Sequence, residues 1–283
     1  MMKLSELSRA KISLTSLNHY ELSEEEIELD RKQREECSKY LPKDYTIKNI
    51  EFKDNLKPIS FTAIHKDEPK FAPGISIMTP YGVKLELVRK MKNNGLLNLQ
   101  ERMEYSFDNY TTKLEWQRKA KEIAMKYVKD YDGKKWFTIT GKTGSGKTHL
   151  ATSIIFGLAG KGIEVEYLSW VDYIHLLKSD FTQEPSRIHF MANVPILYID
   201  DFLKTGTDDS APRDYDMRVA RTIIWNRHDR GLVTIISSEY DLMTDMKLHN
   251  EALAGRLVEN SKEYIIQIGN EENRNYRFFG KED

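Results

Sequence analysis

The feature that most constrains this chain is a glycine-rich run, GKTGSGKT, at residues 141–148. It matches the phosphate-binding pattern G-x-x-x-x-G-K-[ST] in full, with a strand-like segment, WFTIT, before it and an apolar helix-forming segment after it. The backbone N–H groups of such a loop wrap around a phosphate chain, and the following helix N-terminus adds partial positive charge. The alternative is a glycine-rich turn that carries a lysine by chance, and such a turn does not require a strand before it and a helix after it. The run therefore predicts a nucleotide-binding site.

We expect this loop to bind ATP together with Mg²⁺. Lys147 is expected to reach the β- and γ-phosphates, and the hydroxyl of Thr148 is expected to ligate Mg²⁺. The predicted cofactor-binding residues are Gly141, Thr143, Gly144, Ser145, Gly146, Lys147, Thr148 and His149.

Two acidic residues, Asp200 and Asp201, follow the apolar segment PILYI. Because ligands of an open α/β sheet sit at the carboxyl ends of its strands, Asp200 is expected to hold Mg²⁺ through water. The next position in ATPases that activate water is usually Glu, and Asp201 is one methylene shorter. A shorter arm predicts slow hydrolysis but does not affect the binding of ATP. The alternative for both residues is an acidic turn at a strand end.

Helical and strand-like segments alternate from residue 105 onward. Helices are expected at 113–131, 147–158, 171–177 and 218–230, and strands at 136–140, 165–168, 195–199 and 232–236. This alternation is typical of a parallel, doubly wound sheet, so the predicted fold class is α/β.

The first hundred residues have a different pattern. A capping box of Ser23 and Glu26 predicts a helix that runs past Arg34, either as a solvated face or as a partner-binding element. A second helix is expected at 83–91. Residues 41–80 hold five of the chain's eight prolines and are predicted to be a linker or loop-rich stretch.

We therefore expect two regions, a smaller and mostly helical N-terminal domain at 1–100 and an ATPase domain at 105–283.

The 43 basic and 44 acidic residues give a net charge of −1, which excludes a polycation and leaves only a local patch for nucleic acid. The single cysteine excludes an internal disulfide and a multi-cysteine zinc site. No apolar run approaches the roughly 20 residues of a membrane span, so a cytoplasmic protein is expected.

Several short motifs together carry a resemblance. They are SFDNY at 106–110, GKTHLA at 146–151, IDDF at 199–202 and GRL at 255–257. Over residues 105–280 the chain resembles the bacterial and phage replicative helicase loaders of the DnaC/DnaI type. These are AAA+ ATPases related to the transposition ATPase IstB. The resemblance implies a loader that binds a hexameric replicative helicase and delivers it onto single-stranded DNA, as a homo-oligomer that joins through its AAA+ domains.

The resemblance also implies three further catalytic residues. Ser238, at the end of the fourth strand, maps onto sensor 1, although a strand-end cap is the alternative. Arg256 maps onto the arginine finger that acts on a neighbouring subunit's ATP, and the alternative is an ordinary surface charge. Arg277 maps onto sensor 2, with Arg274 beside it in the same arginine cluster.

Single-stranded DNA binding, which the resemblance implies, has one candidate segment. Trp170, Tyr173, Lys178 and Phe181 offer stacking surfaces and a positive charge. The alternative is that Trp170 and Tyr173 pack in the core at helical spacing. Two other functions stay open: an IstB-like ATPase that assembles on duplex DNA, and a non-hydrolysing, nucleotide-gated adaptor that inhibits a host replication protein.

Overall fold

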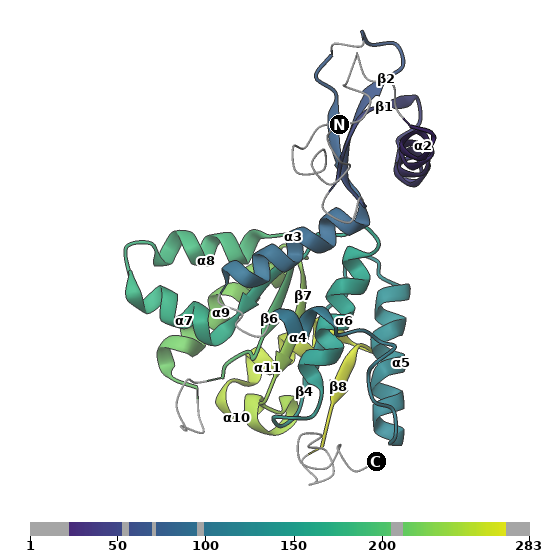
Figure 1. The fold of residues 1–283 in the computed structure, drawn as a ribbon. Helices are drawn as coiled ribbons and strands as arrows, with labels where there is room; N and C mark the ends of the chain where they lie inside the picture. Colours follow the sequence, from purple (N-terminus) through teal and green to yellow (C-terminus); the bar gives the residue numbers. More distant parts are fainter. Residues whose placement is uncertain (1–22, 53–56, 70–71, 95–98, 205–211, 270–283) are drawn as a thin grey trace. The chain divides into compact units, whose positions relative to one another are not determined.

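The computed structural model describes residues 23–52, 57–69, 72–94, 99–204 and 212–269. The chain divides into two compact units (Figure 1). The first comprises residues 1–86 with 159–163, and the second comprises residues 87–158 with 164–283. Each unit contains its own sheet, with three strands in the first and five in the second. No helix in the described ranges is long and apolar enough to cross a membrane.

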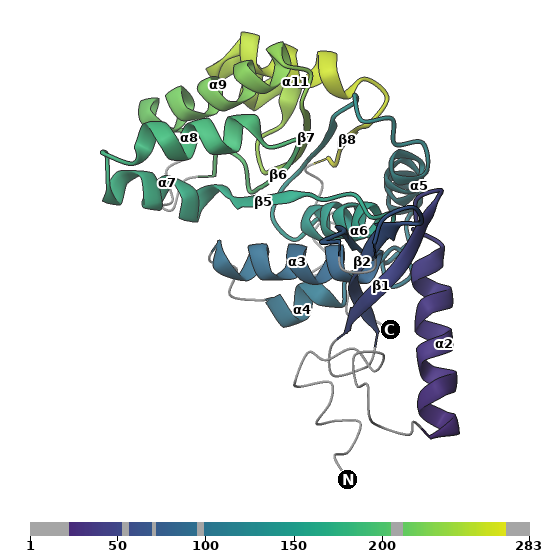
Figure 2. The ribbon, with the colours of Figure 1, turned by 90° about the horizontal axis from the view of Figure 1, so that it is seen from above.

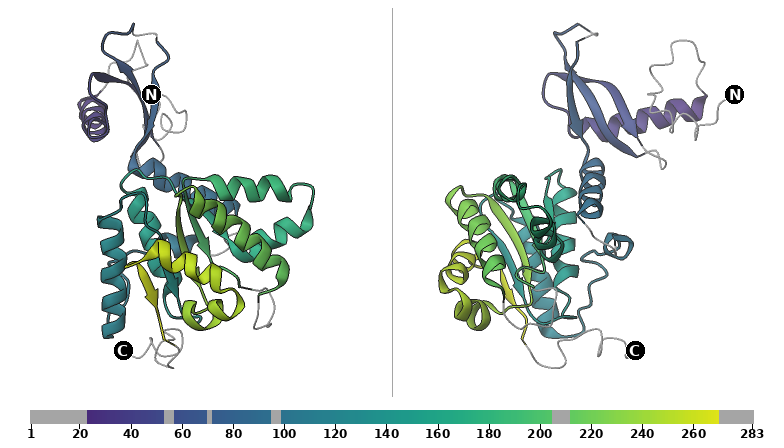
Figure 3. Two further views of the ribbon diagram at one scale, coloured as in Figure 1. Left: turned by 180° about the vertical axis from the view of Figure 1, so that it is seen from behind. Right: turned by 90° about the vertical axis from the view of Figure 1, so that its left-hand side faces the viewer.

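The described part of the N-terminal unit contains helix α2 and a small antiparallel sheet. Helix α2 (Glu24–Ser38) packs along strands β1 (Tyr45–Phe52) and β2 (Pro58–His65), as Figure 3 shows, and β3 (Ile75–Met78) pairs with the other edge of β2. Most of the buried side chains of this sheet lie on the central strand β2. The residues that form the core of this unit are Cys37, Ile50, Phe61 and Ala63.

The expected helix after Ser23 is confirmed, but the expectation of a linker at 41–80 is wrong. The prolines of this stretch lie where a strand or helix tolerates them: Pro58 is the first residue of β2, and Pro80 is the first residue of helix α3 (Pro80–Asn93). The remaining prolines lie in the connections between elements. A sheet therefore accompanies the expected helices, and α3 confirms the helix expected at 83–91.

The second unit is a parallel sheet with the strand order β5-β6-β7-β4-β8, which confirms the α/β class. Its strands are β4 (Phe137–Thr140), β5 (Glu166–Ser169), β6 (Ile196–Asp200), β7 (Val233–Ser238) and β8 (Ile265–Gln267). Every residue of β4, β6 and β7 is buried, as expected for strands that helices cover on both faces.

The helices of this unit lie on both faces of the sheet. They are α4 (Leu99–Met103), α5 (Glu115–Lys129), α6 (Lys147–Ala159), α7 (Trp170–Ser179), α8 (Glu184–Asn193), α9 (Asp214–Asp229), a π-helical turn η2 (Leu242–Met246), α10 (Lys247–His249) and α11 (Glu251–Ser261). Figure 2 shows α8, α9 and α11 on one face and α6 on the other. Because β7 lies between β6 and β4, the carboxyl ends of these three strands meet at one edge, next to the phosphate-binding loop.

A fully buried arginine joins the helical layer to the sheet. The Arg227 guanidinium, on α9, donates to the carbonyl oxygens of Met191 at 3.0 Å and Val194 at 2.7 Å, and to the Thr234 hydroxyl at 2.9 Å. It also donates to the carbonyl oxygens of Pro195 and Val233. These bonds join the end of α8 to the starts of β6 and β7. A hydrophobic residue of similar size cannot donate such hydrogen bonds.

We predict that Arg227→Leu lowers the free energy of unfolding by about 3 kcal/mol, because buried carbonyl groups lose their donor. Urea unfolding followed by circular dichroism measures this change. Arg221→Leu, on the exposed face of the same helix, is the matched control and should change the free energy by less than about 0.5 kcal/mol. Equal effects of the two substitutions would contradict the assigned role of Arg227.

Candidate nucleotide-binding site

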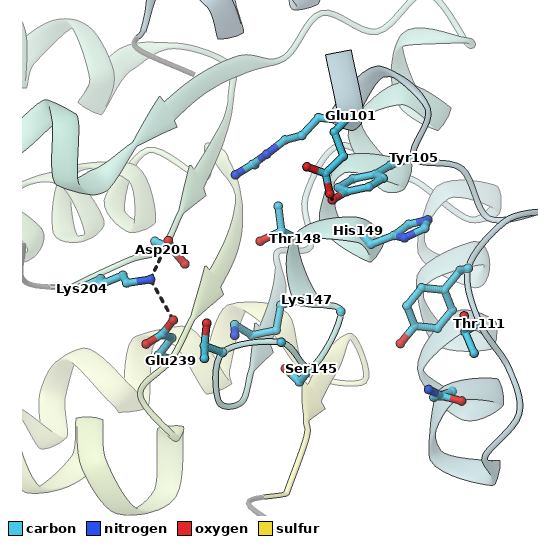
Figure 4. A pocket seen from close by; sticks show the side chains of 16 residues that line it. Glu101, Tyr105, Thr111, Ser145, Lys147, Thr148, His149, Asp201, Lys204 and Glu239 are labelled. Carbon is cyan, nitrogen blue, oxygen red and sulfur yellow. Dashed lines mark hydrogen bonds and ion pairs between the residues drawn. The ribbon is translucent and has the colours of Figure 1, made fainter. Parts of the chain in front are cut away.

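A cavity of about 370 Å³ lies beside the phosphate-binding loop, at the carboxyl ends of β6 and β7 (Figure 4). The loop and the first turn of α6 line one wall. Residues 101–117, which precede and begin α5, line another, and the ends of β6 and β7 supply the third. The residues that the loop and α6 contribute are Thr143, Gly144, Ser145, Gly146, Lys147, Thr148 and His149. Gly141 lies behind the loop, outside the lining.

Two glycines explain why the loop can take this shape. Gly146 has φ +82°, and a Cβ there would lie 3.0 Å from the Tyr110 ring. Gly141 has φ +149°, and its Cβ would lie 2.8 Å from the Cβ of Ile268. Glycine alone adopts these angles without strain and leaves room for the neighbouring side chains. The glycine pattern of the sequence is therefore required by the closed path of the backbone.

Lys147 places a buried cation at the centre of the cavity. Its side chain is 5% exposed, and its ammonium group donates to the carbonyl oxygen of Lys142 at 2.9 Å. Burial lowers the pKa of Lys147, and the negative charges of Glu239 and Asp201 oppose that change. A buried ammonium group that donates to a neutral carbonyl, and not to a carboxylate, keeps its charge available for an anion such as a phosphate chain.

Asp200 lies almost fully buried at the end of β6, 3% exposed. Its Oδ1 accepts hydrogen bonds from the hydroxyls of Ser237 at 2.7 Å, Tyr198 at 2.8 Å and Thr148 at 3.5 Å. Burial alone would raise the pKa of Asp200, but the Arg102 guanidinium and these hydroxyl donors hold it below its usual value. The structure therefore brings together Thr148 and Asp200, the two residues predicted to bind the metal.

Asp201 shares a lysine with a third acidic residue. The ammonium group of Lys204 lies 3.2 Å from Asp201 Oδ2 and 2.9 Å from Glu239 Oε1, as Figure 4 shows. Burial and the charge of Asp200 raise the pKa of Asp201. Lys204 and Glu239 are residues of this site that the sequence reasoning missed. The available signal was that Glu239 directly follows β7, one of the strands that end at the phosphate-binding loop.

The structure places Ser238 in a strand-end cap. Its hydroxyl donates to the carbonyl oxygen of Phe202 at 2.8 Å and accepts from the N–H of Tyr240 at 3.1 Å. Ser238 is 0% exposed and lies outside the cavity lining, whereas its neighbour Glu239 faces the cavity. The end of β7 thus offers a carboxylate to the phosphate site instead of a hydroxyl.

The predicted arginines lie away from this cavity or outside the described residues. Arg256, on α11, pairs with Glu259 at 2.8 Å, and its side chain is 38% exposed. It does not line the cavity of its own chain. Arg274 and Arg277 lie outside the described residues.

Two of the four side chains expected to bind single-stranded DNA lie in the core. Trp170 is 0% exposed and Tyr173 is 5% exposed, so the core-packing alternative is confirmed for both residues. Lys178 pairs with Asp216 at 3.1 Å, and Phe181 is 62% exposed. The expectation that Trp170 and Tyr173 offer stacking surfaces is therefore wrong, because helix α7 packs these two residues in the core.

The residues present fit a magnesium nucleotide. Among the described residues, the buried hydroxyls of Ser145 and Tyr110 have no hydrogen-bond partner, although both line the cavity. A bound nucleotide supplies acceptors for both groups. Mg²⁺ at such sites is held by one or two protein oxygens together with phosphate oxygens. Thr148 and Asp200 can provide the protein oxygens.

Comparison with known proteins identifies the family. Residues 117–277 match the family model described as "Novel STAND NTPase 3". The chain belongs to this family. The match begins within α5 and includes the phosphate-binding loop, Asp200 and Glu239.

The relatives agree with the resemblance seen in the sequence. The uncharacterized protein YqaM of Bacillus subtilis (strain 168) is 28% identical over 191 residues, which are 65% of this chain and 60% of YqaM. The replicative helicase loader DnaC of Escherichia coli (strain K12) is 31% identical over 122 residues, 41% of this chain and 49% of DnaC. The chain thus spans less than two thirds of either relative. The DnaC-like resemblance and the AAA+ nucleotide-binding fold are confirmed.

Solved structures of helicase loaders are similar to part of the chain. The crystal structure of the DnaC helicase loader has a TM-score of 0.47 and 24% identity, and it covers 60% of this chain and 99% of its own. The crystal structure of DnaI has a TM-score of 0.48 and 21% identity, with 61% and 92% covered.

We predict that Lys147→Ala weakens nucleotide binding by about 10- to 100-fold, since charge-assisted hydrogen bonds to phosphate are worth about 1.5–3 kcal/mol. The midpoint of thermal unfolding without nucleotide should not fall, because the substitution removes a buried charge. Isothermal titration calorimetry with an ATP analogue and differential scanning calorimetry measure the two quantities.

Lys134→Ala, at an exposed lysine before β4, is the control and should leave nucleotide affinity unchanged. A folded Lys147→Ala variant with wild-type affinity would show that the cavity is not the nucleotide site.

Proposed function

We propose that this chain is an ATP-dependent loader, which binds a hexameric replicative helicase and delivers it onto single-stranded DNA when replication begins. The observation that carries the proposal is the 31% identity to the helicase loader DnaC, in a chain whose phosphate-binding cavity is complete. The fold alone would serve many functions, because P-loop sheets are shared by many NTPases.

In this proposal the residues of the cavity divide the work of ATP hydrolysis. Lys147 and the loop N–H groups hold the phosphates, and Thr148 and Asp200 hold Mg²⁺, whose charge offsets the charge that develops on the phosphates. Asp201 and Glu239 are the carboxylates available to orient the attacking water. Glu239 has the longer arm, so it can compensate for the short side chain of Asp201.

The N-terminal region at 1–100 is the proposed helicase-binding part, and the region at 105–283 is the proposed ATPase domain. The first unit has its own core and sheet, and α2 carries an exposed apolar residue, Ile27, at 55% exposure. Because this unit folds around its own core, it can bind a partner separately from the nucleotide cavity, whose lining lies in the second unit. Single-stranded DNA is the proposed ligand of the ATPase domain, with Phe181 as the remaining exposed aromatic residue of the candidate segment.

The test of this function uses the full chain, the hexameric replicative helicase of its host, and circular single-stranded DNA coated with binding protein. We predict that ATP and the wild-type chain transfer the helicase onto the circles, as measured by co-sedimentation and strand unwinding. Lys147→Ala should lose most of the transfer, and Lys134→Ala should retain it.

Failure to bind the helicase would contradict the proposal. Assembly on duplex DNA with capture of a transposase would identify an IstB-like ATPase. Nucleotide binding without turnover, in the presence of helicase and DNA, would identify a nucleotide-gated adaptor.

Arg256 is proposed to act on the ATP of a neighbouring subunit. It lies outside the cavity of its own chain, and its guanidinium is partly exposed beside Glu259. A finger of this kind stabilises the transition state more than the bound substrate, so it affects turnover more than affinity. Arg277 remains the proposed sensor 2.

We predict that Arg256→Ala keeps ATP affinity within about twofold and loses at least about 100-fold in turnover, since arginine fingers contribute about 10³–10⁵-fold to the rate where the site is otherwise complete. Mixing this variant with Lys147→Ala should restore part of the turnover, because each chain supplies what the other lacks. Arg221→Ala is the control. Mixed subunits that assemble together without any recovery would contradict the shared site.

A further inference from the structure

An arginine from outside the phosphate-binding loop pairs with the carboxylate that is predicted to bind the metal. Arg102, on α4, forms an ion pair and a hydrogen bond with Asp200 Oδ2. The Arg102 side chain is 17% exposed and the Asp200 side chain is 4% exposed, so water screens the pair only weakly. Arg102 also lines the nucleotide cavity, which distinguishes this pair from an ion pair buried in the core.

Among the residues that the structure describes, Arg102 is the cation that contacts Asp200. The other groups on its two oxygens are the hydroxyls of Thr148, Tyr167, Tyr198 and Ser237, which donate hydrogen bonds but carry no charge. A carboxylate this deeply buried requires a cation nearby. In this structure the guanidinium of Arg102 supplies it.

Magnesium and Arg102 therefore need the same carboxylate. Asp200 Oδ1 lies 3.5 Å from the hydroxyl of Thr148, the other expected metal ligand, and Oδ2 of the same group holds Arg102. Full retention of the ion pair beside Mg²⁺ would place a monovalent and a divalent cation on one buried carboxylate. Two cations on the same carboxylate repel each other strongly in a site of low polarity. The contact of Asp200 with Mg²⁺ therefore opposes its contact with Arg102.

The chain around Arg102 allows the side chain to move while the backbone stays in place. Three residues further on, the Tyr105 ring stacks on His149 with centroids 4.3 Å apart and an interplanar angle of 9°. The hydroxyl of Tyr105 donates to Glu101 at 2.8 Å. These contacts anchor α4 beside the start of α6, so departure of the guanidinium from Asp200 requires a change of the Arg102 rotamer and not a movement of the helix.

We propose that Arg102 is a positioning residue that acts through Asp200: it neutralises this carboxylate when the cavity holds no nucleotide, and it leaves Asp200 when magnesium nucleotide binds. The inference rests on the proposed use of magnesium ATP by this site. As one consequence, nucleotide binding requires a higher Mg²⁺ concentration in the wild type than in a chain without this arginine. As a second consequence, the position of the Arg102 side chain depends on whether the site is filled.

The test is a titration of Mg²⁺ into the full chain with a fluorescent ATP analogue, followed by anisotropy. Arg102→Ala should reach half-maximal binding at roughly tenfold less Mg²⁺ than the wild type, the change expected for loss of one competing charge-assisted contact. Arg102→Lys, which retains the charge, should lie between the two. Arg221→Ala, an exposed arginine on α9, is the matched control and should match the wild type.

Thermal unfolding gives a second readout that remains useful if Arg102→Ala is less stable. Without nucleotide this variant should unfold at a lower temperature than the wild type, because Asp200 has lost its cation. With saturating Mg²⁺ and ATP analogue the two midpoints should converge, since the metal replaces the missing charge. A purely structural arginine would lower both midpoints equally.

The results separate the two proposals. If the wild type binds the magnesium nucleotide and Arg102→Ala needs the same Mg²⁺ concentration, the inference about Arg102 is wrong and the nucleotide site stands. A higher Mg²⁺ requirement in Arg102→Ala would identify Arg102 as a phosphate ligand and also overturn the inference. A wild-type chain that binds no magnesium nucleotide would overturn both the inference and the proposed ATPase.

Discussion

The buried carboxylate of Asp200 is the interaction on which the organisation of the ATPase unit depends. A charge at 3% exposure is stable only if its surroundings supply donors and a cation, and here they come from five elements. The contributing residues are Arg102 on α4, Thr148 on α6, Tyr167 on β5, Tyr198 on β6 and Ser237 on β7. The need to satisfy one carboxylate therefore ties the phosphate-binding loop to three strands of the sheet.

The remaining charges of the cavity follow the same principle. Lys204 bridges Asp201 and Glu239, while Lys147 donates to a backbone carbonyl. These charged side chains of the cavity therefore have partners within the chain. In the proposed function, a phosphate chain and its metal exchange some of these partners for external ones, so charge is redistributed without leaving an uncompensated ion in a buried site. This arrangement links occupancy of the site to side chains on α4 and after β6.

Much of the fold follows from local pattern, and the failures have identifiable causes. Strand β6 was predictable because it is fully buried and apolar up to Asp200, and β4 was predictable because it directly precedes the phosphate-binding loop. The proline content of residues 41–80 predicts a linker, and that prediction is wrong because Pro58 is the first residue of strand β2, where proline is tolerated. The helical spacing of Trp170 and Tyr173 fits a DNA-stacking surface and also fits a helix packed on a sheet. Their burial in the core shows that the second holds.

The sequence by itself determined the phosphate-binding loop, the α/β class and the relation to helicase loaders, because these depend on residues close together in the chain. Only the tertiary structure decided which side chains complete the site. Arg102 lies 98 positions from Asp200, and Lys204 lies 35 positions from Glu239. The Lys204–Glu239 pair depends on β7 lying beside β6, and the Arg102–Asp200 pair depends on α4 lying at the end of β6. Strand order and helix placement are set by long-range packing that no local pattern encodes.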